Sequence, residues 1–187
     1  MNRRSALLLV LGAALSASAC TTPHYDGRVA AQWASAPYTL ASGDKLRIIV
    51  FGQDTLSNIY AVDGAGRISM PLIGPVQVAG RSTAEAAQAI EAKLRAGFLR
   101  EPRVTVEVDS YRPFFVLGEV TNSGQFPFVN GMTVQTAVAI AGGFTPRALR
   151  TSAEITRQTA QGPVSAKVPV SYAVRPGDTI VIGERWF

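Results

Sequence analysis

The sequence predicts an α+β fold made of two small mixed domains. Two observations carry this prediction. Residues 37–110 contain short strand patterns before and after one capped helix, and residues 113–187 repeat the same order. Turn-forming residues separate the patterns, and Arg112-Pro113 marks the start of the second series. We therefore expect two domains with these bounds, each with a core of its own.

A leader, MNRRSALLLVLGAALSASAC, precedes both domains and ends at the only cysteine of the chain, Cys20. Its positively charged start, apolar middle and small residues before the cysteine are typical of secretory signals. We expect residues 1–19 to be a lipoprotein signal peptide, Cys20 to carry the lipid, and residues 20–36 to be a tether. An ordinary secretory signal with an incidental cysteine stays open, because Ala17 stands where lipoprotein signals usually carry Leu.

The first domain should contain four strands and one helix. The strand patterns occupy residues 45–51, 67–73, 75–80 and 103–109. Ser82 and Glu85 have the spacing of a capping box, so a helix should begin there. Its buried stripe should consist of residues spaced by four: Ala86, Ile90, Leu94 and Phe98.

The second domain should contain five strands and a shorter helix. The strand patterns occupy residues 114–120, 125–129, 153–157, 164–170 and 179–182. Thr133 can cap the helix, whose apolar face is formed by Val134, Ala137, Val138 and Ala141. Gly118 interrupts the first strand pattern. We expect it to permit a backbone geometry or a close approach that a β-branched residue would block.

The charge and cysteine content of the chain bear on nucleic-acid binding and on disulfide bonding. The net charge is +5, two of the positive charges lie in the leader, and no run of Lys and Arg concentrates the rest. The sequence therefore does not indicate a nucleic-acid partner. A single cysteine also excludes an intramolecular disulfide.

The residue inventory offers little for catalysis. The only histidine, His24, lies in the tether, so no Ser-His triad, two-His zinc site or Cys-His pair is indicated. Asp44, Asp63 and Asp178 each stand beside a glycine, where an aspartate usually bonds the backbone of its own turn. The stretch GEVTNSG matches no nucleotide-binding glycine pattern. We therefore expect no enzyme activity, no catalytic residue, no cofactor and no bound metal.

Four phenylalanines could be imagined as a platform on which sugars stack: Phe114, Phe115, Phe126 and Phe128. Their strand context favours core packing instead.

Long stretches of the chain resemble a known family. YTLASGDKLRIIVFGQDTLS, VDGAGRISMPLIGPVQVAGRSTAEAAQAIEAKL and FLREPRVTVEV are similar to the N-terminal domain of outer-membrane polysaccharide export proteins of the Wza type. RPFFVLGEVTNSGQFPFVNGMTVQTAVAIAGGF and the closing VRPGDTIVIGERWF resemble the SLBB module, a soluble-ligand-binding β-grasp domain. The resemblance implies that residues 37–110 are the export domain and residues 113–187 the SLBB domain.

The resemblance implies transport without catalysis, in the export of a capsule or exopolysaccharide. The expected protein is a lipoprotein on the periplasmic face of the outer membrane, assembled as a ring of identical subunits. Its expected partners are the exported polysaccharide and an inner-membrane polysaccharide co-polymerase. The largest family members continue beyond the SLBB domain into a pore-lining helix that this sequence lacks, so either a separate outer-membrane pore protein completes the path or the chain is a periplasmic adaptor.

A second function stays open: a module that binds glycan or protein in the envelope and forms no conduit. A ring-sized oligomer would favour transport, and a monomer or dimer would favour binding.

Overall fold

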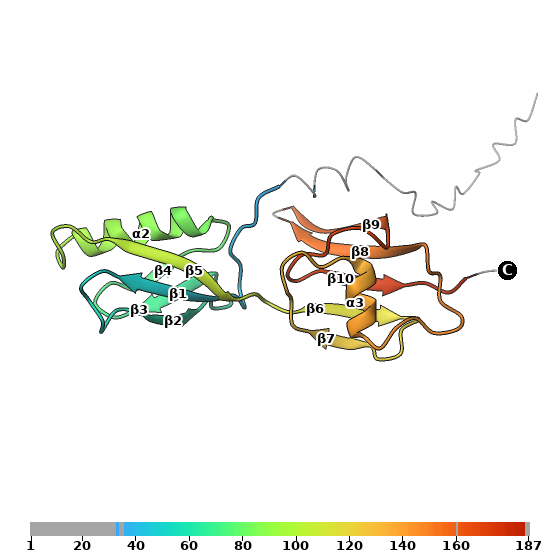
Figure 1. Cartoon of the computed structure of the whole chain (residues 1–187). Coiled ribbons are helices and arrows are strands. Elements are labelled where there is room, and N and C mark those ends of the chain that lie inside the picture. The colour runs from blue at the N-terminus through green and yellow to red at the C-terminus, as the bar shows by residue number, and fades with distance from the viewer. Residues whose placement is uncertain (1–32, 34–35, 160, 186–187) are drawn as a thin grey trace, which may run out of the picture.

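The computed structural model describes residues 33, 36–159 and 161–185, which form ten strands and two helices. Strands β1 to β5 and helix α2 make up the first unit, and strands β6 to β10 and helix α3 make up the second (Figure 1). Each unit has its own cluster of buried apolar side chains. The predicted α+β fold of two small domains is confirmed.

The first unit is built on an antiparallel sheet of order β2-β1-β5, beside which β3 and β4 form a separate hairpin. The strands are β1 (Lys45–Val50), β2 (Asn58–Ala61), β3 (Arg67–Met70), β4 (Gly74–Gln77) and β5 (Val104–Ser110). β1 buries every second residue, as its alternating pattern requires. β2 was not predicted, because none of its four residues is fully buried and its sequence shows no alternation.

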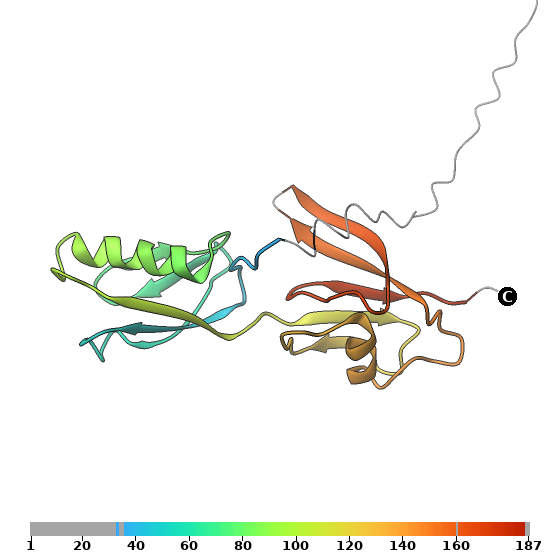
Figure 2. The ribbon, with the colours of Figure 1, turned by 45° about the horizontal axis from the view of Figure 1, so that its top comes forward.

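Helix α2 (Thr83–Arg95) begins as predicted, at a capping box. The Ser82 hydroxyl accepts from the Glu85 N–H at 3.2 Å, and the Glu85 carboxylate accepts from the Ser82 N–H at 2.7 Å. The buried face consists of Ala86, Ile90 and Leu94. Phe98 does not extend this face: it lies after the helix end and is 50% exposed. Figures 1 and 2 show α2 alongside β5.

The second unit is a five-stranded sheet of order β7-β6-β10-β8-β9. Its strands are β6 (Phe114–Gly118), β7 (Gly124–Phe126), β8 (Ser152–Thr159), β9 (Gly162–Pro169) and β10 (Thr179–Ile182). β10 pairs in parallel with β6 and antiparallel with β8. β6 and β7 form the antiparallel hairpin that the sequence favours.

Helix α3 (Val134–Ile140) lies against one face of this sheet (Figure 2). Thr133 caps it as predicted, and its predicted apolar residues are buried: Val134, Ala137, Val138 and Ala141. Gly118 ends β6 with φ +86°, and a Cβ there would lie 2.1 Å from the carbonyl oxygen of Ile182. The predicted close approach at Gly118 is therefore confirmed.

Candidate functional site

The three aspartates beside glycines bond the backbone of their own turns, as predicted. Asp63 accepts from the N–H groups of Ala65 and Arg67 at 2.9 and 2.8 Å. Asp44 and Asp178 each accept from the N–H three residues earlier, at 2.9 and 2.7 Å. Asp44 and Asp178 are also fully buried and paired with arginines, which no local pattern in the sequence indicates.

Asp44 holds the start of the connection between the two units. Its carboxylate accepts from the Tyr38 hydroxyl at 2.5 Å and from the backbone N–H of Arg112 at 3.0 Å. The Arg112 guanidinium lies 3.4 Å from the same carboxylate and donates to the Tyr38 hydroxyl at 3.1 Å. Arg112 follows the last strand of the first unit, and Asp44 lies in the turn that precedes the first strand of that unit. These hydrogen bonds therefore hold the two ends of the first unit together.

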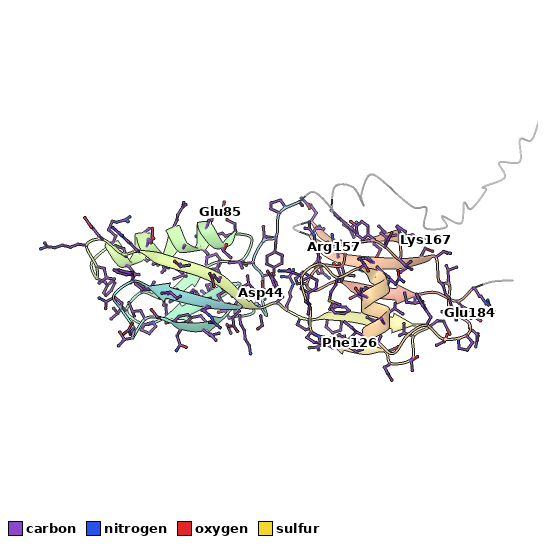
Figure 3. All side chains as sticks on the ribbon, in the orientation of Figure 1. Asp44, Glu85, Phe126, Arg157, Lys167 and Glu184 are labelled. Carbon is purple, nitrogen blue, oxygen red and sulfur yellow. The ribbon has the colours of Figure 1, made fainter. Side chains whose placement is uncertain are left out.

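Asp178 makes the corresponding cluster in the second unit. It accepts two parallel hydrogen bonds from Arg157, from Nε at 2.8 Å and from Nη2 at 2.7 Å. The Trp33 ring covers the guanidinium, with Cζ of Arg157 4.7 Å from the ring centroid. Trp33 precedes the first unit in sequence but belongs to the buried cluster of the second. In Figure 3, Asp44 and Arg157 lie on the sides of the two units that face each other.

Two glycine turns, one from each unit, enclose the Arg112 side chain. Gly43 and Gly177 have φ of +93° and +82°. A Cβ at Gly177 would lie 2.5 Å from Nε of Arg112, and one at Gly43 would lie 3.3 Å from its Cβ. The Gly177 N–H also donates to the Pro113 carbonyl at 3.0 Å. Glycine is needed at residue 177 both for its backbone conformation and for this approach.

A cavity of about 630 Å³ lies between the units, and we call it the inter-unit cavity. The first unit contributes the segment from Pro37 to Ser42, and the second contributes the C-terminal end of β8 and the turn before β10. Three arginines line it: Arg112, Arg157 and Arg175. Its size is in the range of small-molecule sites.

Burial at the cavity shifts the pKa values of nearby arginine and tyrosine side chains. Burial, and then the charge of Arg157, lower the pKa of Arg175. Burial and the hydrogen bond to Asp44 raise the pKa of Tyr38, so its hydroxyl stays a donor. Tyr172, which lines a neighbouring pocket together with Arg157, also has its pKa raised by burial, although the charge of Arg157 acts in the opposite direction.

No local pattern in the sequence indicates the three arginines of this site. Arg112-Pro113 marks a domain start and Asp178 marks a turn, and neither observation assigns a partner to the neighbouring arginine. The available signal was Arg175 in the same turn as Asp178; Arg112 and Arg157 lie 68 and 21 residues from the aspartates that they bind.

The four phenylalanines divide between the core and the surface. Phe114 is fully buried, and Phe126 and Phe128 pack against the same cluster, as expected. Phe115 is 39% exposed on the face of the sheet that α3 does not cover. Core packing was therefore the wrong expectation for Phe115 alone.

Cys20, the predicted lipidation site, and His24 lie outside the described residues. Within the part of the chain that the structure describes, no cluster of three His, Cys, Asp or Glu side chains could hold a metal ion. No helix in that part is long and apolar enough to cross a membrane.

Comparison with known proteins gives the family context. Residues 33–109 match the family model described as "Polysaccharide biosynthesis/export protein", and residues 113–166 match the SLBB domain. The exopolysaccharide production protein ExoF of Rhizobium meliloti (strain 1021) is 33% identical over 147 residues, which is 72% of this chain and 32% of ExoF. The polysialic acid transport protein KpsD of Escherichia coli is 28% identical over 111 residues, 58% of this chain and 20% of KpsD. The match thus spans about a third of one relative and a fifth of the other.

Proposed function

This chain belongs to the polysaccharide export proteins in which an export domain is followed by an SLBB domain, and on that premise we propose that it is a component of a polysaccharide export complex. The observation that carries the proposal is the order of the two matched domains, which run from residue 33 to residue 166 with three residues between them. The printed functions of ExoF and KpsD, exopolysaccharide production and polysialic acid transport, support it.

We further propose that the protein is a periplasmic lipoprotein of the outer membrane. In this arrangement residues 1–19 are the signal peptide, Cys20 carries the lipid, and residues 20–36 are the tether, docked at Trp33, to the folded units at residues 37–110 and 113–187. Since each buried methylene adds about 0.8 kcal/mol, several acyl chains hold the protein on the membrane. Cys20→Ser should release it in a salt wash or leave the precursor unprocessed. Equal fractionation of wild type and variant, with no labelled palmitate in either, would refute the anchor.

The proposed role is passage of the polymer without covalent chemistry. A conduit for a hydrated polymer needs weak, repeated contacts, because a tight site would stall transit. An inner-membrane co-polymerase would supply the polysaccharide, and a separate outer-membrane pore protein would carry the polysaccharide across the outer membrane.

Deletion of the gene tests this role. The strain should lose its surface or secreted polysaccharide while its lipid-linked precursors continue to be made. Normal export, in a strain without a paralogue, would remove the transport proposal. A changed glycan composition with unchanged export would instead support an enzymatic role.

Self-association into a ring is part of the proposal, and exposed apolar side chains on the first sheet support it. Ile49 and Ile59 lie on the face of the β2-β1-β5 sheet turned away from the core, and they are 48% and 46% exposed. Phe51, just beyond β1, is 79% exposed. Neighbouring exposed apolar residues are a common sign of a protein interface.

Analytical ultracentrifugation of the full chain in detergent tests the ring. Ile59→Lys should reduce the oligomer, whereas Leu72→Lys, at an exposed apolar position in the turn between β3 and β4, should leave it unchanged. A monomeric or dimeric wild type would favour the second candidate function, a binding module without a conduit. The inter-unit cavity is the observation that favours that candidate.

A further inference from the structure

The inter-unit cavity carries more positive than negative charge. Three guanidinium groups line it, and two buried carboxylates, Asp44 and Asp178, lie behind it. Asp44 pairs with Arg112, and Asp178 pairs with Arg157. One positive charge, that of Arg175, remains without a carboxylate among the salt bridges of the described residues.

Arg175 is held at the cavity by a weaker contact than the other two arginines. Its Nη2 donates to the backbone carbonyl of Ala36, an acceptor without a formal charge. Burial and the neighbouring Arg157 both disfavour its charged form. An anion entering the cavity would relieve this cost, since an opposite charge stabilises a partly buried cation.

Arg157 also lines the cavity, but its side chain is already paired. The Arg157 residue is 8% exposed, and its Nε and Nη2 are occupied by Asp178. Its third nitrogen, Nη1, is buried and lies outside these two hydrogen bonds, and the Tyr172 hydroxyl also interacts with the Arg157 side chain. Arg157 therefore adds positive charge to the cavity wall, while Arg175 is the arginine without a carboxylate partner among the described salt bridges.

The rest of the cavity wall suits a sugar. Neutral hydrogen-bonding groups of Thr39, Ser42, Gln158 and Thr159 lie beside the arginines. Pro37 and Pro176 add apolar surface. Hydroxyl and amide groups match sugar hydroxyls, while a guanidinium matches a carboxylate with two parallel hydrogen bonds.

We propose that the inter-unit cavity binds a carboxylate-bearing sugar residue, with Arg175 as the residue that contacts the carboxylate. That the sugar belongs to an exported polymer rests on the proposed function; the preference for an acidic saccharide rests on the cavity alone. The site joins both units, so the bound sugar would contact the segment before β1 and the turn before β10 together.

Calorimetric titration of the full chain in detergent tests the site. The probe is trigalacturonate, and its fully methyl-esterified form keeps the rings and removes the charge. The acid should bind and the ester should not. Arg175→Gln should weaken binding of the acid by about tenfold, the size expected for a lost charge-assisted hydrogen bond.

Two further variants control for the loss of charge and for the position of the substitution. Arg100→Gln makes the same change of charge in the loop between α2 and β5, at the end of the first unit away from the second (Figure 1), and should leave affinity unchanged. Arg175→Lys keeps the charge and should retain most of the binding. Thermal melts of all three variants check that the fold is intact.

Three results would overturn the proposal: no binding of the acid, equal binding of acid and ester, or equal loss in the Arg175→Gln and Arg100→Gln variants. None of these depends on export. A deletion strain that exports normally would refute the proposed function while leaving a positive titration in place.

Discussion

The close approach at Gly118 gives a stability prediction in which two costs can be separated. A side chain at residue 118 must adopt φ near +86° and must also fit a Cβ that would lie 2.1 Å from the Ile182 carbonyl oxygen. Left-handed backbone costs a non-glycine residue about 1–2 kcal/mol. Overpacking against a closely packed neighbour adds about 1–3 kcal/mol. Gly118→Ala should therefore lower the free energy of unfolding of the second unit by about 2–5 kcal/mol.

Gly131 provides a matched control in the same unit. Its φ is +81°, and a Cβ there would meet nothing within 4 Å. Gly131→Ala should therefore show the backbone cost alone, about 1–2 kcal/mol. The effect of alanine on the unfolded chain is common to both variants and cancels in their difference.

Urea unfolding and native-state hydrogen exchange measure the difference. The Glu119 N–H, which donates to the Ile182 carbonyl at 2.9 Å, reports directly on the contact. Its protection should fall more in Gly118→Ala than in Gly131→Ala. If the two variants lose the same stability and protection, the contact between β6 and β10 is not close enough to exclude a Cβ, and the reasoning fails.

Three further predictions concern helix α2. Leu94→Asp places a charge in the core of the first unit and should lower the free energy of unfolding by several kcal/mol. Phe98→Asp, at a half-exposed position, should change it little. If thermal melts do not separate the two variants, the buried face of the helix is misplaced. Ser82→Ala removes the cap acceptor for the Glu85 N–H and should cost about 1 kcal/mol in urea unfolding, and a loss near zero would contradict the capping role. Hydrogen bonds from the Ser82 N–H and hydroxyl hold the pKa of Glu85 below its ordinary value of 4.5. The stability that the ionised Glu85 adds is therefore complete above pH 4.5 and is lost as the pH falls through the lower pKa of the folded state. The difference in melting temperature between wild type and Glu85→Ala should shrink over this acid range and stay constant above it.

Local signals explain what the sequence predicts well. The capping box at Ser82 and the alternation in β1 involve residues close together in the chain, and both elements form where expected. β2 has no such signal, because its residues are exposed or partly exposed. Phe98 failed because the helix ends at Arg95 and Gly97 follows with φ +141°, so the four-residue spacing no longer places its side chain on the buried face.

The candidate site depends on contacts that local patterns do not encode. Asp44 and Arg112 are separated by 68 residues, and Asp178 and Arg157 by 21. The turn interpretation of both aspartates was right, yet it could not reveal which cation each would hold. The sequence predicts a tether that includes Trp33, whereas the Trp33 ring packs in the second core and covers Arg157.

The central place of β10 has a consequence for the order in which the second unit can be built. β10 lies between β6 and β8 but follows the other four strands in the chain. The hairpins β6-β7 and β8-β9 can form early from local contacts, whereas the sheet is joined only after Thr179–Ile182 has been synthesised. Until then, the facing edges of β6 and β8 expose unpaired N–H and C=O groups that can capture strands of other chains. A nascent chain interrupted before Thr179 would therefore expose two unpaired strand edges. Such a chain would be a substrate for chaperones and proteases, because its second unit could not complete its sheet.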